Sequence, residues 1–175
     1  MAVQVSAPAP DFTMDAVVDG GKFQQIKLSD YKGKWIVLFF YPLDFTFVCP
    51  TEITAFRDRL DEFKKLNAVV VGASIDSKFS HKAWIEQQLK DLHYPLASDL
   101  SKDVSRRYGI LLEDKGISLR GTFIIDPEGI LKWQLVNDLG IGRSVDEVLR
   151  VLTALQTGEL CQANWKPGQK TLGKA

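Results

Sequence analysis

Residues 34–41 read KWIVLFFY, a continuous apolar run that predicts a strand covered on both faces. Pro42 ends this strand, and a loop follows it. From Cys49 onward, apolar residues recur every three or four positions, which predicts an amphipathic helix continuing to residue 66. Pro50 suits the first helical position, so Cys49 should lie at or beside the N-cap. A strand followed by such a helix favours an α/β architecture.

Strand and helix patterns continue to alternate along the chain. Further strands are predicted at 68–75, 121–126 and 131–135, and further helices at 79–90, at 102–108 behind a Ser101 cap, and after the Ser144-Val-Asp-Glu147 capping box. Residues 1–33 are interpreted as irregular. This order predicts a mixed sheet with helices on both faces, as in thioredoxin-like folds. We expect one domain over 1–158 and a polar tail over 159–175.

The composition excludes several classes of protein. The 175 residues include 22 basic and 22 acidic ones, and 45% of them are hydrophobic, which suits one domain with a real core. The zero net charge gives no electrostatic reason to expect a nucleic acid or a membrane as partner. No apolar run is long enough to span a bilayer, and the first residues do not resemble a signal peptide. A cytoplasmic protein is therefore expected.

The chain contains two cysteines, Cys49 and Cys161. A thiol reacts as its thiolate, and a helix N-terminus supplies orphan N–H groups and partial positive charge that favour this form. Cys49 is therefore placed for activation, although the same position suits a small buried apolar residue. Its position alone leaves both interpretations open. A structural disulfide is not expected in a reducing compartment, so the pair is either inert or redox-active.

The residues around Cys49 decide between these interpretations. Residues 40–52 read FYPLDFTFVCPTE, which closely resembles the active-site segment of the peroxiredoxins, in particular their typical two-cysteine subgroup. The resemblance extends over nearly the whole chain. It includes residues 9–12, 76–84, 119–127 and 158–168. Gln162 departs from the family pattern, in which proline usually follows the second cysteine.

The resemblance implies a role for each matching residue. It assigns catalytic roles to Cys49, Cys161, Thr46, Pro42 and Arg120, and supporting roles to Glu52 and Trp84. Cys49 would attack the peroxide and become a sulfenic acid, which Cys161 of another subunit would convert to a disulfide. Thr46 would orient the peroxide and hydrogen-bond the thiolate, Pro42 would shield the pocket, and Arg120 would stabilise the developing negative charge. Taken singly, these three could equally be a loop cap, a strand stop and a surface charge.

The resemblance also implies the partners. We expect hydroperoxide substrates, a thioredoxin-type or flavoprotein disulfide reductant, and a homodimer or a ring of five dimers, with no bound cofactor. The peroxide-sensitive members of the family carry a Gly-Gly-Leu-Gly insertion and a C-terminal Tyr-Phe helix over the active site. This chain has neither, so it should resist overoxidation.

Other functions have weaker support. Cysteines and histidines at 49, 81, 93 and 161 lack the short spacings of structural zinc sites. A thioredoxin-like disulfide exchanger would need Cys-x-x-Cys, but Glu52 occupies the second cysteine position. A holdase on the same fold would not need Cys49. Neither a phosphate-binding loop nor a Gly-x-Gly-x-x-Gly motif follows a predicted strand.

Overall fold

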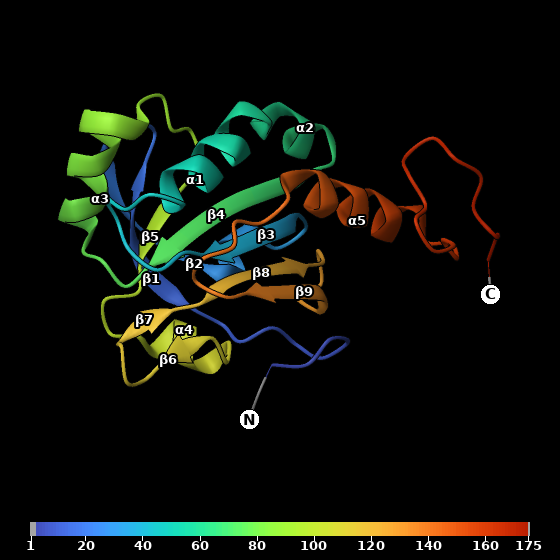
Figure 1. Cartoon of the computed structure of the whole chain (residues 1–175). Helices are drawn as coiled ribbons and strands as arrows, with labels where there is room; N and C mark the ends of the chain where they lie inside the picture. Colours follow the sequence, from blue (N-terminus) through green and yellow to red (C-terminus); the bar gives the residue numbers. More distant parts are fainter. Residues whose placement is uncertain (1–2, 175) are drawn as a thin grey trace. The chain divides into compact units, whose positions relative to one another are not determined.

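The computed structural model describes residues 3–174 and divides the chain into two compact units, one ending at Arg143 and one beginning at Ser144. The first unit is built on a seven-stranded sheet with the order β2-β1-β5-β4-β3-β8-β9 (Figure 1). Its strands are β1 (Thr13–Val18), β2 (Lys22–Lys27), β3 (Trp35–Phe40), β4 (Ala68–Ser74), β5 (Leu96–Ser98), β8 (Arg120–Ile125) and β9 (Leu131–Asn137). Two short strands, β6 (Leu111–Leu112) and β7 (Ile117–Ser118), pair separately.

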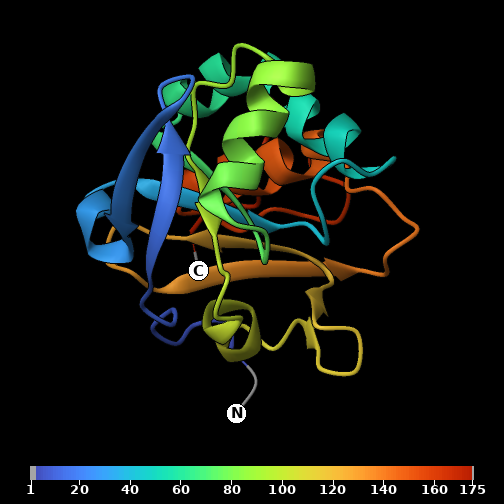
Figure 2. The ribbon, with the colours of Figure 1, turned by 90° about the vertical axis from the view of Figure 1, so that its left-hand side faces the viewer.

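The sheet is mixed, as the sequence predicts. β3, β4 and β5 are parallel neighbours, whereas β3–β8, β8–β9, β1–β2 and β1–β5 are antiparallel. Helices α1 (Cys49–Asp58), α2 (Leu60–Lys65) and α3 (Lys78–Trp84) lie on one face, and α4 (Asp103–Arg107) lies on the other (Figures 1 and 2). This arrangement confirms the predicted thioredoxin-like class.

β3 is covered on both faces because its side chains alternate between two apolar layers. Leu38 and Phe40 enter one core cluster together with Phe123 of β8. Phe39 points to the opposite face, where its ring stacks on Phe56 of α1 with a centroid distance of 4.4 Å. This contact fixes α1 against the strand that precedes it, and thereby places the start of α1 at the end of β3.

The N-terminal prediction is wrong over residues 13–31. A hairpin of β1 and β2 pairs there in register, with Met14 opposite Ile26, and a 3-10 turn follows at Leu28–Tyr31. The turn residues Asp19, Gly20 and Gly21 have φ values of 46°, 70° and 146°. Glycine adopts such values at little cost, so the Asp-Gly-Gly run is a hairpin signal within a segment that had been predicted to be irregular.

Three helical predictions also need correction. The helix after Cys49 breaks at Arg59, where φ is −112° and ψ is 14°, so α1 and α2 are separate. The helix predicted over 79–90 is α3 followed by a π-helical turn, Ile85–Leu89. The principal cap of α4 is the buried Asp99 carboxylate, which accepts from the amides of residues 104 and 105 at 3.1 and 2.7 Å. The Ser101 hydroxyl accepts only a longer bond, of 3.4 Å.

The second unit consists of α5 (Val145–Thr157) and the segment after it. The Ser144 side chain accepts a hydrogen bond from the Glu147 amide at 3.2 Å, which confirms the predicted cap. Gly158 ends the helix with a φ of 64°, a left-handed C-cap that suits glycine. None of the helices in the described part of the chain has the length and apolar character needed to cross a membrane.

Candidate active site

Cys49 is the first residue of α1, and Val48 occupies the N-cap position. The predicted location beside the N-cap is therefore confirmed. No side chain caps this helix, and the Cys49 thiol is only 1% exposed. The thiol thus lies at the positive end of the helix dipole, and its shielding from bulk water increases the influence of nearby charges on it.

Arg120, the first residue of β8, faces this thiol. Its Nη1 donates to Cys49 Sγ at 3.3 Å and to Glu52 Oε2 at 2.6 Å, while Nε donates to the Leu139 carbonyl at 2.8 Å. The residue is 4% exposed, so it is not the solvated surface charge that a strand-end arginine usually is. Three directed hydrogen bonds hold the guanidinium against the sulfur.

Glu52 lies one helical turn after Cys49 and joins two arginines. Besides the bond from Arg120, its carboxylate accepts from the Arg143 amide at 2.9 Å, from Nε at 2.8 Å and from Nη2 at 3.2 Å. All three side chains are at most 4% exposed. Two guanidinium groups and one carboxylate leave one positive charge in excess beside the sulfur, so the site can stabilise negative charge that develops there during a reaction.

Arg143 was missed by the sequence analysis. It also donates to the carbonyls of Gly121 and Phe40, at 2.9 and 2.6 Å, and its guanidinium carbon lies 5.0 Å from the centre of the Phe39 ring. Burial lowers the pKa of Arg143, and the Glu52 carboxylate opposes this shift. The only local signal for this residue in the sequence is a basic side chain directly before the Ser144 helix cap.

Pro42 and Thr46 lie on the loop between β3 and α1. Pro42 is buried, and Thr46 is partly exposed. The Thr46 hydroxyl donates to the Leu43 carbonyl at 2.9 Å. A hydroxyl has one proton to donate, so in this conformation Thr46 offers its lone pairs, and not its proton, to a neighbouring group.

Trp84 is fully buried at the end of α3 and packs behind the same loop. Its ring centre lies 5.9 Å from that of Tyr41 and 5.7 Å from that of Phe45, and its indole N–H donates to the Gln88 side chain at 2.8 Å. The contact with Phe45 is notable because that residue has a φ of 55° within the loop. Trp84 therefore supports the shape of the loop.

A buried polar cluster holds the same loop in place through the Asp44 side chain. The Asp44 carboxylate accepts from the Tyr41 hydroxyl at 2.8 Å and from the Ser80 hydroxyl at 2.7 Å, and it lies 2.8 Å from His81 Nδ1. Burial, reinforced by the Asp44 charge, raises the pKa of Tyr41 well above its usual value. His81 is thus a core residue. Within residues 3–174, no group of three or more His, Cys, Asp or Glu side chains is arranged to hold a metal ion.

Cys161 lies in the second unit, three residues after Gly158. It is a partly exposed free thiol, whose sulfur lies 3.8 Å from Thr157 Oγ1 and from the Glu159 carbonyl. Its sulfur contacts a hydroxyl and a carbonyl, whereas the sulfur of Cys49 accepts a hydrogen bond from a guanidinium.

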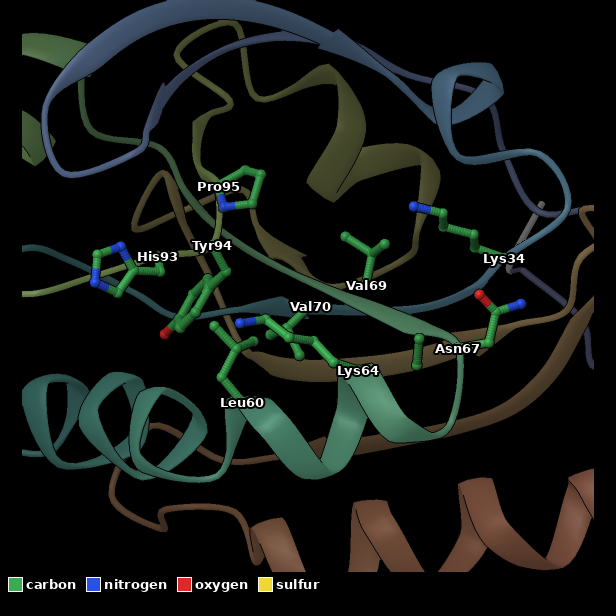
Figure 3. Close-up of a pocket in the computed structure, with 10 residues that line it drawn as sticks. Lys34, Leu60, Lys64, Asn67, Val69, Val70, His93, Tyr94 and Pro95 are labelled. Atoms are coloured by element: carbon green, nitrogen blue, oxygen red, sulfur yellow. The ribbon is translucent and has the colours of Figure 1, made fainter.

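A cavity of about 350 Å³ lies elsewhere in the first unit, between α2, the start of β4 and the segment before β5 (Figure 3). It is lined by Lys34, Leu60, Lys64, Asn67, Ala68, Val69, Val70, His93, Tyr94 and Pro95. None of the residues predicted to be catalytic lines it. Cys49 is therefore not part of this cavity.

Comparison with known proteins identifies the family of the chain. The AhpC/TSA family matches residues 5–134, a stretch that contains Cys49, Glu52 and Arg120. The chain belongs to this family, the peroxiredoxins. It is 54% identical to Peroxiredoxin-1 of Gallus gallus over 177 residues, covering 96% of this chain and 89% of that protein. It is 58% identical to a mitochondrial thioredoxin-dependent peroxide reductase of Drosophila melanogaster over 175 residues, covering 95% and 74%.

A solved structure extends the likeness to three dimensions. The crystal structure of a reduced 2-Cys peroxiredoxin from Plasmodium vivax matches with a TM-score of 0.93 and 41% identity, covering 96% of this chain and 92% of that one. Like the peroxiredoxins it matches, the chain is an enzyme, a thiol-dependent peroxidase. The predicted family and class of activity are therefore confirmed, while the role of each residue remains a prediction.

Proposed function

We propose that the enzyme reduces hydrogen peroxide and organic hydroperoxides with the thiolate of Cys49. The observation that carries this proposal is the Arg120 guanidinium, which donates to Cys49 Sγ at 3.3 Å in a site that is almost closed to solvent. A buried guanidinium bonded to the sulfur is already in place to stabilise the negative charge that moves to the leaving oxygen.

In the proposed step the Cys49 sulfur attacks one oxygen of the hydroperoxide and the O–O bond breaks. The sulfur gains that oxygen as a sulfenic acid, and the other oxygen leaves as an alkoxide or hydroxide that takes up a proton. Negative charge moves from the sulfur to the leaving oxygen during this step. Arg120 can follow this shift by contacting both atoms, and Glu52 and Arg143 hold it in position.

The loop residues orient the substrate and exclude water. Because the Thr46 hydroxyl already donates its proton to the Leu43 carbonyl, we assign Thr46 the role of accepting a hydrogen bond from the peroxide. Pro42 shields the sulfur, and Trp84 keeps the loop in shape through its packing on Tyr41 and Phe45. This geometry differs from the expectation that the Thr46 hydroxyl also donates to the thiolate.

Cys161 is the proposed resolving residue, on a tail of residues 159–175 that follows the peroxidase domain of 1–158. Its sulfur would bond to the sulfenic sulfur of a partner subunit, and the sulfenic oxygen would leave as water. A dithiol protein of the thioredoxin class, or a flavoprotein disulfide reductase, would then reduce the disulfide by exchange. The name of the Drosophila relative supports the first reductant. A dimer or a ring of five dimers, in the cytoplasm, completes the proposal.

Two variants test the roles of the cysteines. Cys49→Ser should abolish peroxide consumption because it removes the activated nucleophile. Cys161→Ser should consume about one equivalent per subunit and then stall unless a small thiol is supplied. Turnover by Cys49→Ser with reductant present would refute the assignment.

The partner-subunit scheme has its own test. Peroxide-treated wild-type protein should run as a covalent dimer on a non-reducing denaturing gel and return to monomer with reductant. A quantitative disulfide within a single chain would refute this scheme.

A further inference from the structure

The cavity at the start of β4 lies where the pairing of two strands stops early. β4 and β5 run parallel from Gly72, opposite Leu96, and the Gly72 amide donates to the Pro95 carbonyl at 3.0 Å. The next bond of this ladder would need an N–H group from residue 95, and proline has none. Within residues 3–174, the first residues of β4 are therefore paired with β3 but not with β5.

The cavity occupies the gap that this early stop leaves. Val69 and Val70 of β4 both line it, although successive side chains of a strand point to opposite faces of the sheet. A cavity that contacts both must reach around the unpaired edge of the strand. Residues 93–95 line its other side, and α2 contributes Leu60 and Lys64 (Figure 3). The cavity is thus a notch in the sheet, which we call the edge cavity.

The wall of the edge cavity is apolar and held in place by the core. Leu60, Val70 and Tyr94 are buried and line it. The Tyr94 hydroxyl donates to the Ile53 carbonyl of α1 at 2.8 Å, and its ring meets that of Phe39 edge-on with a centroid distance of 6.0 Å. These contacts fix the wall before any ligand arrives. The volume of about 350 Å³ falls within the range of about 300 to 1,000 Å³ that is usual for small-molecule sites.

The rim of the edge cavity carries positive charge. Lys34 and Lys64 are exposed there, and both side chains extend toward the end of the cavity at Tyr94 (Figure 3). Within residues 3–174, no hydrogen bond or ion pair engages the Lys34 ammonium group. The Lys64 ammonium group contacts Asp61 at 3.2 Å, but this pair is exposed and therefore weak. None of the residues that line the cavity is acidic. The rim is therefore suited to an anion.

We propose that the edge cavity binds a small organic monocarboxylate. Its apolar body would lie against Leu60 and Tyr94, and its carboxylate would meet the ammonium groups of Lys34 and Lys64 at the rim. A simple anion such as phosphate would leave the apolar wall without a contact, and a neutral molecule would leave the ammonium groups without a counter-charge. Because the edge cavity does not include Cys49, this inference does not depend on the function proposed above.

Octanoate is the probe for the chemical class of the ligand. Calorimetric titration of the reduced wild-type protein should show saturable binding at one site per subunit, and the amide resonances of Val69 and Val70 should shift in NMR spectra. Inorganic phosphate, which lacks the apolar body, should bind at least about tenfold more weakly. Octanol, which lacks the charge, should bind about fivefold to tenfold more weakly. Phosphate or octanol binding as tightly as octanoate would overturn the proposed class, and absence of saturable octanoate binding would overturn the site.

Two double variants test the location of the site. Lys34→Met with Lys64→Met removes the charges at the rim and keeps apolar side chains of similar length. Lys32→Met with Lys65→Met is the matched control, because these neighbouring lysines do not line the cavity and the change in net charge is the same. All four lysines are exposed, so both proteins should fold. The first variant should weaken octanoate binding about fivefold to tenfold and the control less than twofold. Equal affinities in the two variants would overturn the proposal.

Discussion

The two cysteines of this enzyme are both free thiols, but they are held by different kinds of interaction. Around Cys49, two guanidinium groups and one carboxylate are buried and joined by hydrogen bonds of 2.6 to 3.3 Å. Around Cys161, backbone amides and carbonyls and exposed side chains, the Glu159 carboxylate among them, close a loop. Breaking the first set exposes uncompensated charge in the interior, whereas breaking the second replaces weak bonds with bonds to water.

This difference matches the role that the proposed mechanism gives to each thiol. The reaction with peroxide is accelerated by donors that are already aimed at the developing charge, so the surroundings of Cys49 benefit from being fixed. The reaction between the two sulfurs requires at least one segment to move, so the surroundings of Cys161 benefit from being easily opened. We therefore expect substitutions near Cys49 to have large effects on stability and on the peroxide reaction, and substitutions near Cys161 to have small effects on both.

Glu52→Gln should have the largest effect. It keeps the shape of the side chain but leaves the guanidinium groups of Arg120 and Arg143 buried without their counter-charge, at a cost of about 3–5 kcal/mol in the free energy of unfolding. Urea denaturation measures this cost. Glu62→Gln is the matched control, because the Glu62 side chain is half-exposed and hydrogen-bonded to Arg59 at the surface, and it should change stability by less than about 0.5 kcal/mol. Equal effects of the two variants would contradict the structural importance of the buried cluster.

Arg120→Met should have the second largest effect. Loss of the donor that faces the sulfur should slow sulfenic acid formation by about a hundredfold to a thousandfold, as removal of one preorganised charge-stabilising donor typically does. Stopped-flow mixing of the reduced protein with peroxide gives the rate. Arg106→Met, on the exposed surface of α4, serves as the control and should react like wild type. An unchanged rate in Arg120→Met would remove that residue from the mechanism.

Tyr41→Phe should show a moderate, pH-dependent effect. Burial keeps the Tyr41 hydroxyl protonated in the folded protein well above pH 10, whereas the unfolded chain releases this proton near pH 10. The folded state then binds more protons, so wild-type stability should fall as the pH rises above about 10. The variant should lose about 1 kcal/mol at neutral pH, for the bond to Asp44, and show a shallower fall above pH 10. Parallel pH profiles of unfolding would contradict this account.

Arg150→Met should have the smallest effect. This residue ties the loop at Trp165 to α5, but its ion pair with Glu147 is partly exposed. The free energy of unfolding should therefore change by less than about 1 kcal/mol, and the rate of the peroxide reaction should not change. A loss as large as that of Glu52→Gln would show that the tail is as tightly held as the site of Cys49.

The parts of this structure that the sequence predicts well are those with a local signal. The apolar run of β3, the start of a helix at Cys49 and the Ser144 cap each depend on neighbours within a few residues, and all three are confirmed. β5 has only three residues and lies in the sheet interior, so no periodicity could reveal it. The Asp19-Gly20-Gly21 turn signal is visible in the sequence, but it predicts a hairpin only together with the two strands that flank it.

The candidate site was predictable where its residues lie in one motif. The segment around Cys49 contains four of the predicted site residues, and the position of Arg120 followed from resemblance to the family. Arg143 could not be found in this way, because its partners Phe40, Glu52 and Gly121 lie 103, 91 and 22 residues away in the sequence. Only the fold brings these groups to one guanidinium.

The central claim is that Cys49 reacts first and Cys161 second. The most direct measurement is time-resolved mass spectrometry of the reduced wild-type protein after mixing with one equivalent of hydrogen peroxide per subunit, with each thiol mapped after quenching. We predict that sulfenic acid appears on Cys49 alone and then decays at the rate at which a Cys49–Cys161 disulfide forms. Oxygen found first on Cys161, or a disulfide formed without prior oxidation of Cys49, would contradict the account.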